Sequence, residues 1–90
     1  MSVKINIHVT LRQHTNGQAV LEEKGATVGE CLKNLVAKYP GLGPAIFVKK
    51  GALNNIVEIY LNMKSAYPNE LAKPLKEGDE IHVTMMLAGG

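Results

Sequence analysis

The sequence has 90 residues, with ten lysines and arginines against eight aspartates and glutamates and a formal net charge of +2 at pH 7. A chain of this length forms one domain, so we expect residues 1–90 to fold as a single unit. The charges are spread without a basic block, which argues against nucleic-acid binding. No apolar run approaches the roughly 20 residues that a membrane helix needs. With Cys31 as its single cysteine, the sequence favours the reducing cytoplasm.

The first predicted element is a strand over residues 3–11. Its period of two indicates one buried face and one polar face. The apolar members of the alternation are Val3, Ile5, Ile7, Val9 and Leu11. The pair Asn16-Gly17 follows, and both residues tolerate positive φ, which is typical of a hairpin turn. We therefore expect a second strand to run back over residues 18–22.

A helix is predicted after Thr27, because apolar residues recur there at helical spacing. They are Val28, Cys31, Leu32, Leu35, Val36 and Tyr39. Thr27 and Glu30 have the spacing of a capping box, in which the hydroxyl accepts from a first-turn amide and the carboxylate reaches back to the cap's own N–H. Pro40-Gly41 indicates the end of the helix. Residues 41–55 are predicted to be a long connection, with a short extended piece near residues 46–48.

Two more strands are predicted in the second half of the chain, over residues 56–61 and 81–87. The two prolines of residues 62–75 indicate turns and at most a short edge strand between them. A turn at residues 76–79 leads into the last strand. The order of elements predicts an α+β fold in which one helix packs on a mixed sheet of four to five strands. In such a fold the first and last strands can lie side by side in the middle of the sheet.

The sequence lacks the motifs that mark common enzyme classes, such as a phosphate-binding loop, a dinucleotide fingerprint or a Gly-x-Ser-x-Gly elbow. His8 and His82 become neighbours if the first and last strands pair, but two imidazoles do not complete a metal site. Cys31 lies on the apolar face of the helix and is interpreted as a buried hydrophobe rather than a nucleophile. Lys49-Lys50 is interpreted as part of a solvated loop. We therefore expect no enzyme activity, no cofactor and no metal site.

The last four residues are Leu87, Ala88, Gly89 and Gly90. Residues without side chains let a backbone thread into a narrow site and approach another group closely. The α-carboxylate of Gly90 could in this way meet the α-phosphate of an ATP molecule that another protein binds. A frayed end without a role is the alternative interpretation. We expect residues 87–90 to form a flexible tail.

The predicted layout, together with LKEGDEIHV at residues 75–83 and the closing LAGG, resembles the ubiquitin-like sulfur carriers of the ThiS and MoaD class. The likeness covers essentially the whole chain. The segments LRQHTNGQ at residues 11–18 and VEIYLN at residues 57–62 are most similar to carriers of that class that serve cysteine biosynthesis. The resemblance implies the ubiquitin-like β-grasp fold. It also implies a sulfur carrier that is a protein cosubstrate and not itself an enzyme.

The resemblance further implies that a ubiquitin-activating-type adenylyltransferase uses ATP to convert the carboxylate of Gly90 to an acyl-adenylate. A sulfur donor then displaces AMP and leaves a thiocarboxylate. In a cysteine-type carrier the sulfur passes to an activated serine on a PLP-dependent synthase, and a metalloprotease releases the amino acid and restores Gly90. The partner implied is thus a PLP-dependent synthase, for cysteine or for homocysteine. Molybdopterin, thiazole and thiolated tRNA stay open as other destinations. Leu87, Ala88, Gly89 and Gly90 would thread into the partner, and the candidate docking residues are Ile56, Tyr60, Met85 and Met86.

Two other functions stay open at this point. The first is a ubiquitin-like protein modifier, in which activated Gly90 is joined to lysines of target proteins. The activation step is the same, so the sequence does not separate the modifier from the carrier. The second is a noncovalent interaction module that uses exposed apolar residues such as Ile56, Tyr60 and Met86 as a contact patch, with a tail that has no role.

Overall fold

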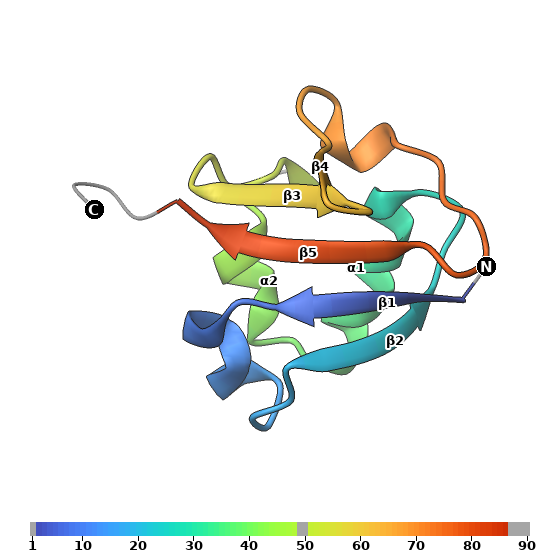
Figure 1. Cartoon of the computed structure of the whole chain (residues 1–90). Coiled ribbons are helices and arrows are strands. Elements are labelled where there is room, and N and C mark those ends of the chain that lie inside the picture. Colours follow the sequence, from blue (N-terminus) through green and yellow to red (C-terminus); the bar gives the residue numbers. More distant parts are fainter. Residues whose placement is uncertain (1, 49–50, 87–90) are drawn as a thin grey trace.

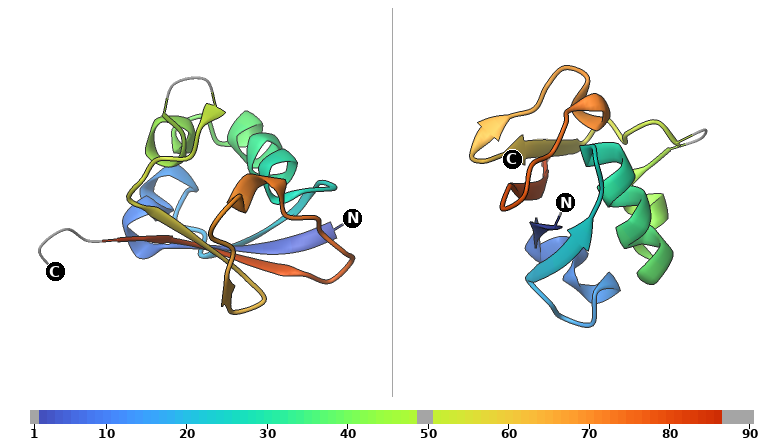
Figure 2. Two further views of the ribbon diagram at one scale, coloured as in Figure 1. Left: turned by 90° about the horizontal axis from the view of Figure 1, so that it is seen from above. Right: turned by 90° about the vertical axis from the view of Figure 1, so that its right-hand side faces the viewer.

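The computed structural model describes residues 2–48 and 51–86. The elements follow in the order β1 (Ser2–Ile7), η1 (Val9–His14), β2 (Val20–Lys24), α1 (Val28–Lys38), α2 (Leu42–Ile46), β3 (Val57–Leu61), β4 (Lys64–Ser65), η3 (Glu70–Ala72) and β5 (Glu80–Met85). Five strands form one sheet, and α1 and α2 lie on one side of it (Figure 1, Figure 2). The prediction of one main helix over a mixed sheet is confirmed. Neither helix is long and apolar enough to cross a membrane, within the residues described.

The two strands from the ends of the sequence, β1 and β5, lie next to each other in the middle of the sheet. The strand order is β2-β1-β5-β3-β4, with β1 and β5 parallel and the other neighbours antiparallel. The register places Ile5 beside Ile81 and Ile7 beside Val83. The predicted pairing of the first and last strands is confirmed, and it makes β5 a central strand.

The core lies between the inner face of the sheet and α1. Ile5 and Ile81 of the central strands and Leu32 of α1 have no exposed surface. This is the result expected when a period-two pattern on the strands faces a helical stripe, because both patterns place their apolar residues on one side. Cys31 is also completely buried in this layer.

The helix start predicted at Thr27 is confirmed, with one difference in the cap. The Thr27 hydroxyl accepts from the N–H of Glu30 at 3.1 Å. The Glu30 carboxylate accepts from the N–H of Ala26 at 2.8 Å, one residue further back than the capping box predicts. Both bonds satisfy N–H groups at the start of α1, where helical partners are lacking.

The strand predicted over residues 3–11 is shorter in the structure, and this part of the prediction was wrong. β1 ends at Ile7, and a 3-10 helix follows over Val9–His14. The His8 side chain accepts from the N–H of Thr10 at 3.2 Å and so begins the 3-10 helix. Leu11 is still buried, but Val9 is 64% exposed, so the inner face of the alternation does not continue past Ile7.

The Asn-Gly turn has the predicted backbone but a different place in the hairpin. Asn16 and Gly17 both have positive φ, at 56° and 82°. β2 runs antiparallel to β1 as expected, although it begins at Val20 rather than residue 18. The two strands are joined by the 3-10 helix and this turn together, because residues 8–14 do not pair with β2.

The connection predicted over residues 41–55 contains a helix that the sequence pattern does not reveal. α2 spans five residues, and Leu42 and Ile46 are both completely buried. The short extended piece expected near residues 46–48 is present as a bridge between Phe47 and Leu53. The pair Lys49-Lys50 lies outside the described residues.

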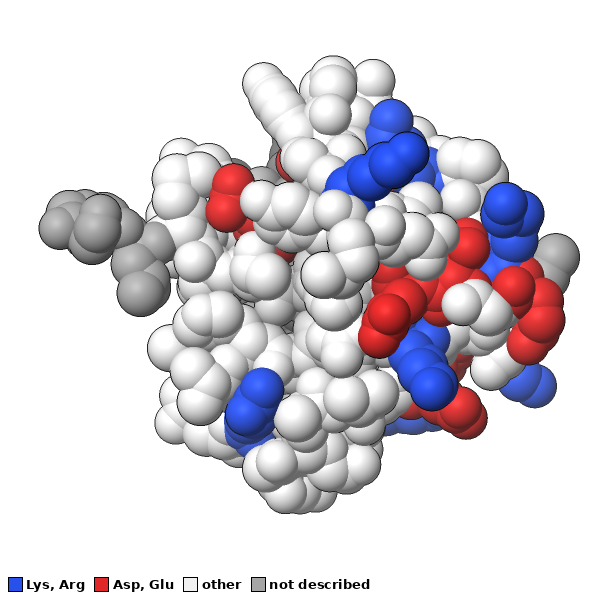
Figure 3. Space-filling model, in the orientation of Figure 1, with Lys and Arg blue, Asp and Glu red and all other residues white. Residues whose placement is uncertain are grey.

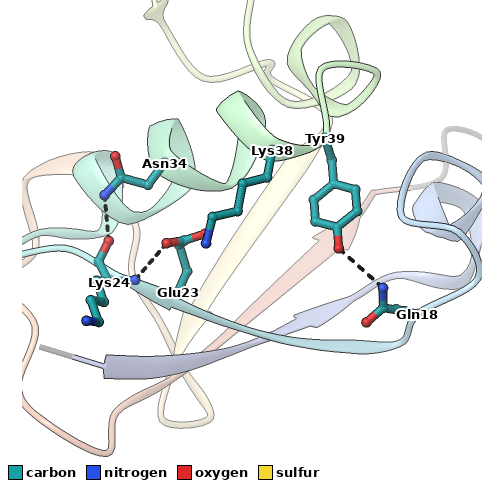
Figure 4. A network of polar contacts seen from close by, with 6 residues as sticks. All are labelled: Gln18, Glu23, Lys24, Asn34, Lys38 and Tyr39. Carbon is teal, nitrogen blue, oxygen red and sulfur yellow. Dashed lines mark hydrogen bonds and ion pairs between the residues drawn. The ribbon is translucent and has the colours of Figure 1, made fainter.

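Polar contacts join α1 to β2 along one side of the molecule (Figure 4). The Glu23 side chain is only 5% exposed and forms an ion pair with Lys38, Oε2 to Nζ at 3.1 Å. Its other carboxylate oxygen accepts from the N–H of Lys24 at 3.0 Å. The Asn34 amide donates to the Lys24 carbonyl at 2.7 Å. Oε1 of this nearly buried carboxylate thus accepts a hydrogen bond, while Oε2 makes none within the described residues and is compensated by the ion pair with Lys38.

We predict that Met63→Gly stabilises the protein. Asn62 and Met63 form the two-residue turn between β3 and β4, with φ of 52° and 70°. A side chain in this left-handed region carries a steric cost that glycine lacks, and the Met63 side chain is 73% exposed, so it contributes little packing. The expected gain in the free energy of unfolding is about 0.5–1 kcal/mol, measured by denaturant titration. Met63→Ala is the control, and an equal gain from alanine would contradict the backbone explanation.

Candidate functional site

The far end of β5 leads directly to the tail residues that the sequence singled out. Its last hydrogen bond to β3 joins the N–H of Met86 to the carbonyl of Ile56 at 2.6 Å. The side chains of both residues are exposed, Met86 to 52% and Ile56 to 41%. Residues 87–90 come next in the chain. Leu87, Ala88, Gly89 and Gly90 lie outside the described residues, so their proposed threading role stays a prediction.

The charges on the outer face of the sheet, the face without helices, gather at the end opposite Met86. Figure 3 shows them over the side where β1 and β5 begin. Lys4, Glu22, Glu77 and Glu80 lie together there. The surface over the other ends of these strands carries few charged side chains (Figure 3). A partner that contacts this face near Met86 therefore removes few charges from water, which favours apolar contact.

The four predicted docking residues separate into two groups. Ile56 and Met86 are neighbours, and Tyr60 lies on the same outer face, where it pairs with His82 of β5. Met85 points the other way and packs partly buried against the core. Successive strand residues face opposite sides, so Met85 and Met86 do not share one surface. Ile56, Tyr60 and Met86 therefore share the outer face and are called the outer docking face below, as a candidate surface, with Glu58 between Ile56 and Tyr60 on the same side of β3.

The two histidines are not direct cross-strand partners. The register places Asn6 beside His82, and the His8 side chain instead meets the Thr10 hydroxyl, Nδ1 to Oγ1 at 2.8 Å. No group of three His, Cys, Asp or Glu side chains that could hold a metal ion is found among residues 2–48 and 51–86. Nε2 of His82 is buried without a hydrogen-bond partner in this part of the chain.

Cys31 has the environment of a packing residue. Burial is the main cause that raises the pKa of its thiol to about 11, and the nearby carboxylate of Glu23 adds to this shift. The thiolate is the nucleophilic form, and a raised pKa keeps it scarce at neutral pH. The structure agrees with the interpretation of Cys31 as a small buried hydrophobe.

One polar cluster at the start of β5 was not anticipated in the sequence analysis. Asp79 accepts from the Asn62 amide at 3.0 Å and from the N–H of Lys76 at 2.7 Å. The Asn62 side-chain oxygen accepts in turn from the N–H of Glu80 at 2.9 Å. These bonds, first the one from Asn62 and then the one from Lys76, hold the pKa of the Asp79 carboxyl below its usual value. Asn62 and Asp79 are 17 positions apart, so local patterns do not reveal their contact.

Comparison with known proteins identifies relatives over the whole length of the chain. The profile of the ThiS family matches residues 5–90. The sulfur carrier protein CysO of Mycobacterium tuberculosis is 31% identical over 93 residues, and the alignment covers 100% of both chains. The predicted resemblance to ubiquitin-like sulfur carriers is confirmed.

Solved structures show the same fold. A chain in the crystal structure of the BexX/CysO complex from Amycolatopsis orientalis is 31% identical, with a TM-score of 0.86, and the match covers 98% of this chain and 99% of that one. The solution structure of small archaeal modifier protein 1 from Methanosarcina acetivorans is 29% identical, with a TM-score of 0.88, over 99% of this chain and 96% of that one. The ubiquitin-like β-grasp fold predicted from the resemblance is confirmed.

We predict that Asp79→Asn lowers the free energy of unfolding at neutral pH by about 1–3 kcal/mol, because an amide replaces a carboxylate that accepts two hydrogen bonds. The folded-state pKa of Asp79 is lowered from 3.8, so its contribution is fully present above the unfolded pKa and is lost as the pH falls through the folded value. The difference between Asp79→Asn and the unchanged protein should therefore shrink below about pH 4. Urea titrations across pH measure it.

The control for this prediction is Glu22→Gln, which neutralises an exposed carboxylate on β2. It should change stability little at any pH, since exposed charges contribute little. A loss for Asp79→Asn that stays constant from neutral pH to below about pH 4 would show that the carboxylate charge does not contribute as described.

Proposed function

The chain belongs to the ThiS family of ubiquitin-like sulfur carriers, and from this premise we propose that the carboxylate of Gly90 is the group that carries the sulfur. Members of this family are carrier proteins and not enzymes. The observation that carries the proposal is the family match, which extends to residue 90 and so includes the closing Gly89-Gly90. Two residues without side chains suit a backbone that has to enter a narrow site in another protein.

The proposed chemistry takes place in two steps on the partner. A carboxylate oxygen of Gly90 attacks the α-phosphate of ATP, and pyrophosphate leaves, which forms the acyl-adenylate. A sulfur donor then attacks the acyl carbon and displaces AMP, so that a C–S bond replaces the C–O bond to the nucleotide. The product is a thiocarboxylate. The sequence contains no nucleotide-binding motif, which is consistent with ATP binding by a ubiquitin-activating-type adenylyltransferase.

The sulfur acceptor that we propose is an activated serine on a PLP-dependent cysteine synthase, or an activated homoserine if the synthase makes homocysteine. Support comes from the 31% identity, over full length, to a protein named sulfur carrier protein CysO. In this scheme the thiocarboxylate sulfur forms a bond to the β-carbon of the serine skeleton, and the activated hydroxyl leaves that carbon together with its activating group. An acyl shift to the amino group follows, and a metalloprotease hydrolyses the new amide to release the amino acid and restore Gly90.

The outer docking face of Ile56, Tyr60 and Met86 is the surface that we propose for the activating enzyme. It lies immediately before the tail, and Glu58 is the charged residue between its members on β3, while the other charges gather at the opposite end of the sheet (Figure 3). Another chain of this family is known in a complex, that of Amycolatopsis orientalis BexX with CysO. A shallow apolar face beside the tail lets a partner hold the folded part of the carrier while residues 87–90 reach the nucleotide.

A protein modifier is the second candidate function. The likeness to small archaeal modifier protein 1 favours it, at 29% identity over nearly the whole chain. Activation would be the same, but the acyl carbon of Gly90 would be attacked by a lysine amine of a target protein. Conjugates of higher mass in native lysate, lost when Gly89 and Gly90 are deleted, would support this function.

We predict that sulfur is found on Gly90 when the protein is isolated from sulfur-replete cells. Intact mass spectrometry should show one oxygen replaced by sulfur, and fragmentation should locate it at residue 90 rather than as oxidation of Cys31 or a methionine. Deleting Gly90, or adding one residue after it where no protease removes that residue, should abolish adenylation by the cognate enzyme. Adding the same residue before Met1 is the control. Undiminished adenylation of the truncated chain would overturn the proposal.

We further predict that Met86→Asp weakens activation by roughly 5- to 30-fold in kcat/KM, mainly through KM, because it places a charge in an apolar contact. Val20→Asp is the matched control, since Val20 is 48% exposed on β2 at the far edge of the sheet and outside the proposed contact. Amide NMR spectra check that both variants fold. Equal effects of the two substitutions would argue against a docking role for this face.

A further inference from the structure

A cavity of about 460 Å³ lies between β3 and the segment that follows β4. This segment stays paired with β3 as far as Ala66, whose N–H donates to the Ile59 carbonyl at 2.9 Å. The chain then continues to η3, which packs against α1 on the helix side of the sheet (Figure 2). β3, the loop before it and η3 all contribute residues to the cavity. Its volume is in the range of sites that hold ligands.

The walls of the cavity are fixed by hydrogen bonds to other elements. The chain just after η3 is anchored to α1, because the N–H of Val28 donates to the Lys73 carbonyl at 2.9 Å. The loop before β3 is anchored to α2, because the N–H of Asn54 donates to the Ile46 carbonyl at 2.7 Å. The Asn54 side chain also accepts from the N–H of Ile56 at 3.1 Å. The fold itself therefore forms the cavity, which lowers the cost of ordering when a ligand binds.

The lining of the cavity combines an apolar part with a polar part. The apolar residues are Leu53, Val57, Ile59 and Met86. The polar part includes the carboxylates of Glu58 on β3 and Glu70 on η3. Tyr67 adds an aromatic ring, and this residue is 67% exposed. An occupant that matches this lining has an apolar stem and a polar head.

The charge of the cavity determines the sign of that head. Within residues 2–48 and 51–86, the carboxylates of Glu58 and Glu70 form no ion pair and accept no hydrogen bond. Both residues are partly buried, so their charges have lost water without gaining a partner. No lysine or arginine of this part of the chain lines the cavity. Two negative charges on a protein of formal net charge +2 favour a cationic occupant here.

An organic cation matches these residues better than a metal ion. No group of three His, Cys, Asp or Glu side chains that could hold a metal ion occurs in the described ranges. The side chain of arginine, in contrast, has a use for each part of the lining. Its guanidinium group donates to carboxylates and stacks on aromatic rings, and its methylene stem covers apolar surface. Arginine is also enriched at protein interfaces, where lysine is depleted.

We propose that the cavity receives an arginine side chain of a partner protein. The guanidinium group lies beside Glu58, Tyr67 and Glu70, and the methylene stem lies against the apolar residues. The partner is the activating enzyme, because Met86 belongs both to the outer docking face and to the cavity. This choice of partner rests on the proposed function, whereas the recognition of arginine does not.

A second copy of this chain does not supply the arginine. The sequence contains one arginine, Arg12. Its Nε group donates to the Ile7 carbonyl at 3.0 Å, and the residue is partly buried. This side chain is therefore already engaged within its own fold, and a partner of different sequence has to provide the guanidinium group.

The first test is NMR titration of the ¹⁵N- and ¹³C-labelled full chain with Nα-acetyl-arginine methylamide. Probes with citrulline or lysine in place of arginine are the controls, at the same ionic strength. Citrulline removes the positive charge at almost unchanged shape, and lysine keeps the charge without the planar group. At tens of millimolar, the arginine probe should shift the carboxyl carbons of Glu58 and Glu70 and the ring signals of Tyr67. It should bind at least about twofold more tightly than either control.

Variants of the protein locate the site. Glu58→Gln and Glu70→Gln should each weaken binding of the arginine probe by about two- to fivefold, and Tyr67→Ala by about twofold. Glu22→Gln should leave binding unchanged, since Glu22 lies in the charged group at the other end of the sheet. Amide spectra check that every variant folds.

Three outcomes of the titration would overturn the arginine site. The first is the absence of shifts at Glu58 and Glu70 beyond those at Glu22. The second is equal binding of the citrulline or lysine probe. The third is an equal loss of binding in Glu22→Gln.

The choice of partner is tested by adenylation with the cognate enzyme. The double variant Glu58→Gln/Glu70→Gln should lower kcat/KM by about three- to tenfold, mainly through KM, and added salt should affect it less than the unchanged chain. Unchanged kinetics would overturn the assignment to the activating enzyme. If the unchanged chain is not adenylated either, the proposed role of Gly90 fails, while the probe titration still decides whether the arginine site exists.

Discussion

The structure depends on the parallel pairing of β1 with β5 in the centre of the sheet. These two strands come from opposite ends of the sequence, and their inner residues, such as Ile5, Ile81 and Val83, are completely buried under α1. The chain between β1 and β5 therefore has to lead from one central strand back to a position beside it. β2 and β3 add on either side, and α1 covers the face that the four strands share. Because β5 is central, its hydrogen bonds to both neighbours fix the position at which Met86 leaves the sheet.

Polar groups then fix how the layers meet. The ion pair of Glu23 with Lys38 holds α1 against β2, while Asp79 and Asn62 join the start of β5 to the end of β3. Both carboxylates are nearly buried, yet each has donors within hydrogen-bond distance. A buried carboxylate without such donors is costly, and apolar burial gives no direction to an interface. These contacts therefore help to fix the position of α1 on β2 and of β5 beside β3, while the hydrophobic core holds the two layers together.

The sequence predicts the elements whose pattern is local, and fails where long-range contacts decide. The helix stripe, the Thr27 cap and the alternation of β5 can be predicted from spacing alone, and all three are confirmed. The alternation of residues 3–11 misleads because the end of a strand depends on its partner, and the partner β2 stops pairing at Asn6. α2 contains a glycine and a proline in five residues, too few for helical periodicity to be visible. The alternation of β5 also places Met85 on the inner side with Ile81 and Val83, as the structure has it, so the docking prediction that grouped Met85 with Met86 conflicts with this pattern.

Met86 is the described residue that immediately precedes residues 87–90. It closes the ladder between β3 and β5, and its exposed side chain belongs to the outer docking face proposed for the activating enzyme. A partner bound to the proposed docking face would contact Met86 and so fix where residue 87 begins. Ordering a backbone residue costs roughly 1–2 kcal/mol of conformational entropy. A partner that first binds Met86 would therefore lower the entropic cost that remains for positioning residues 87–90.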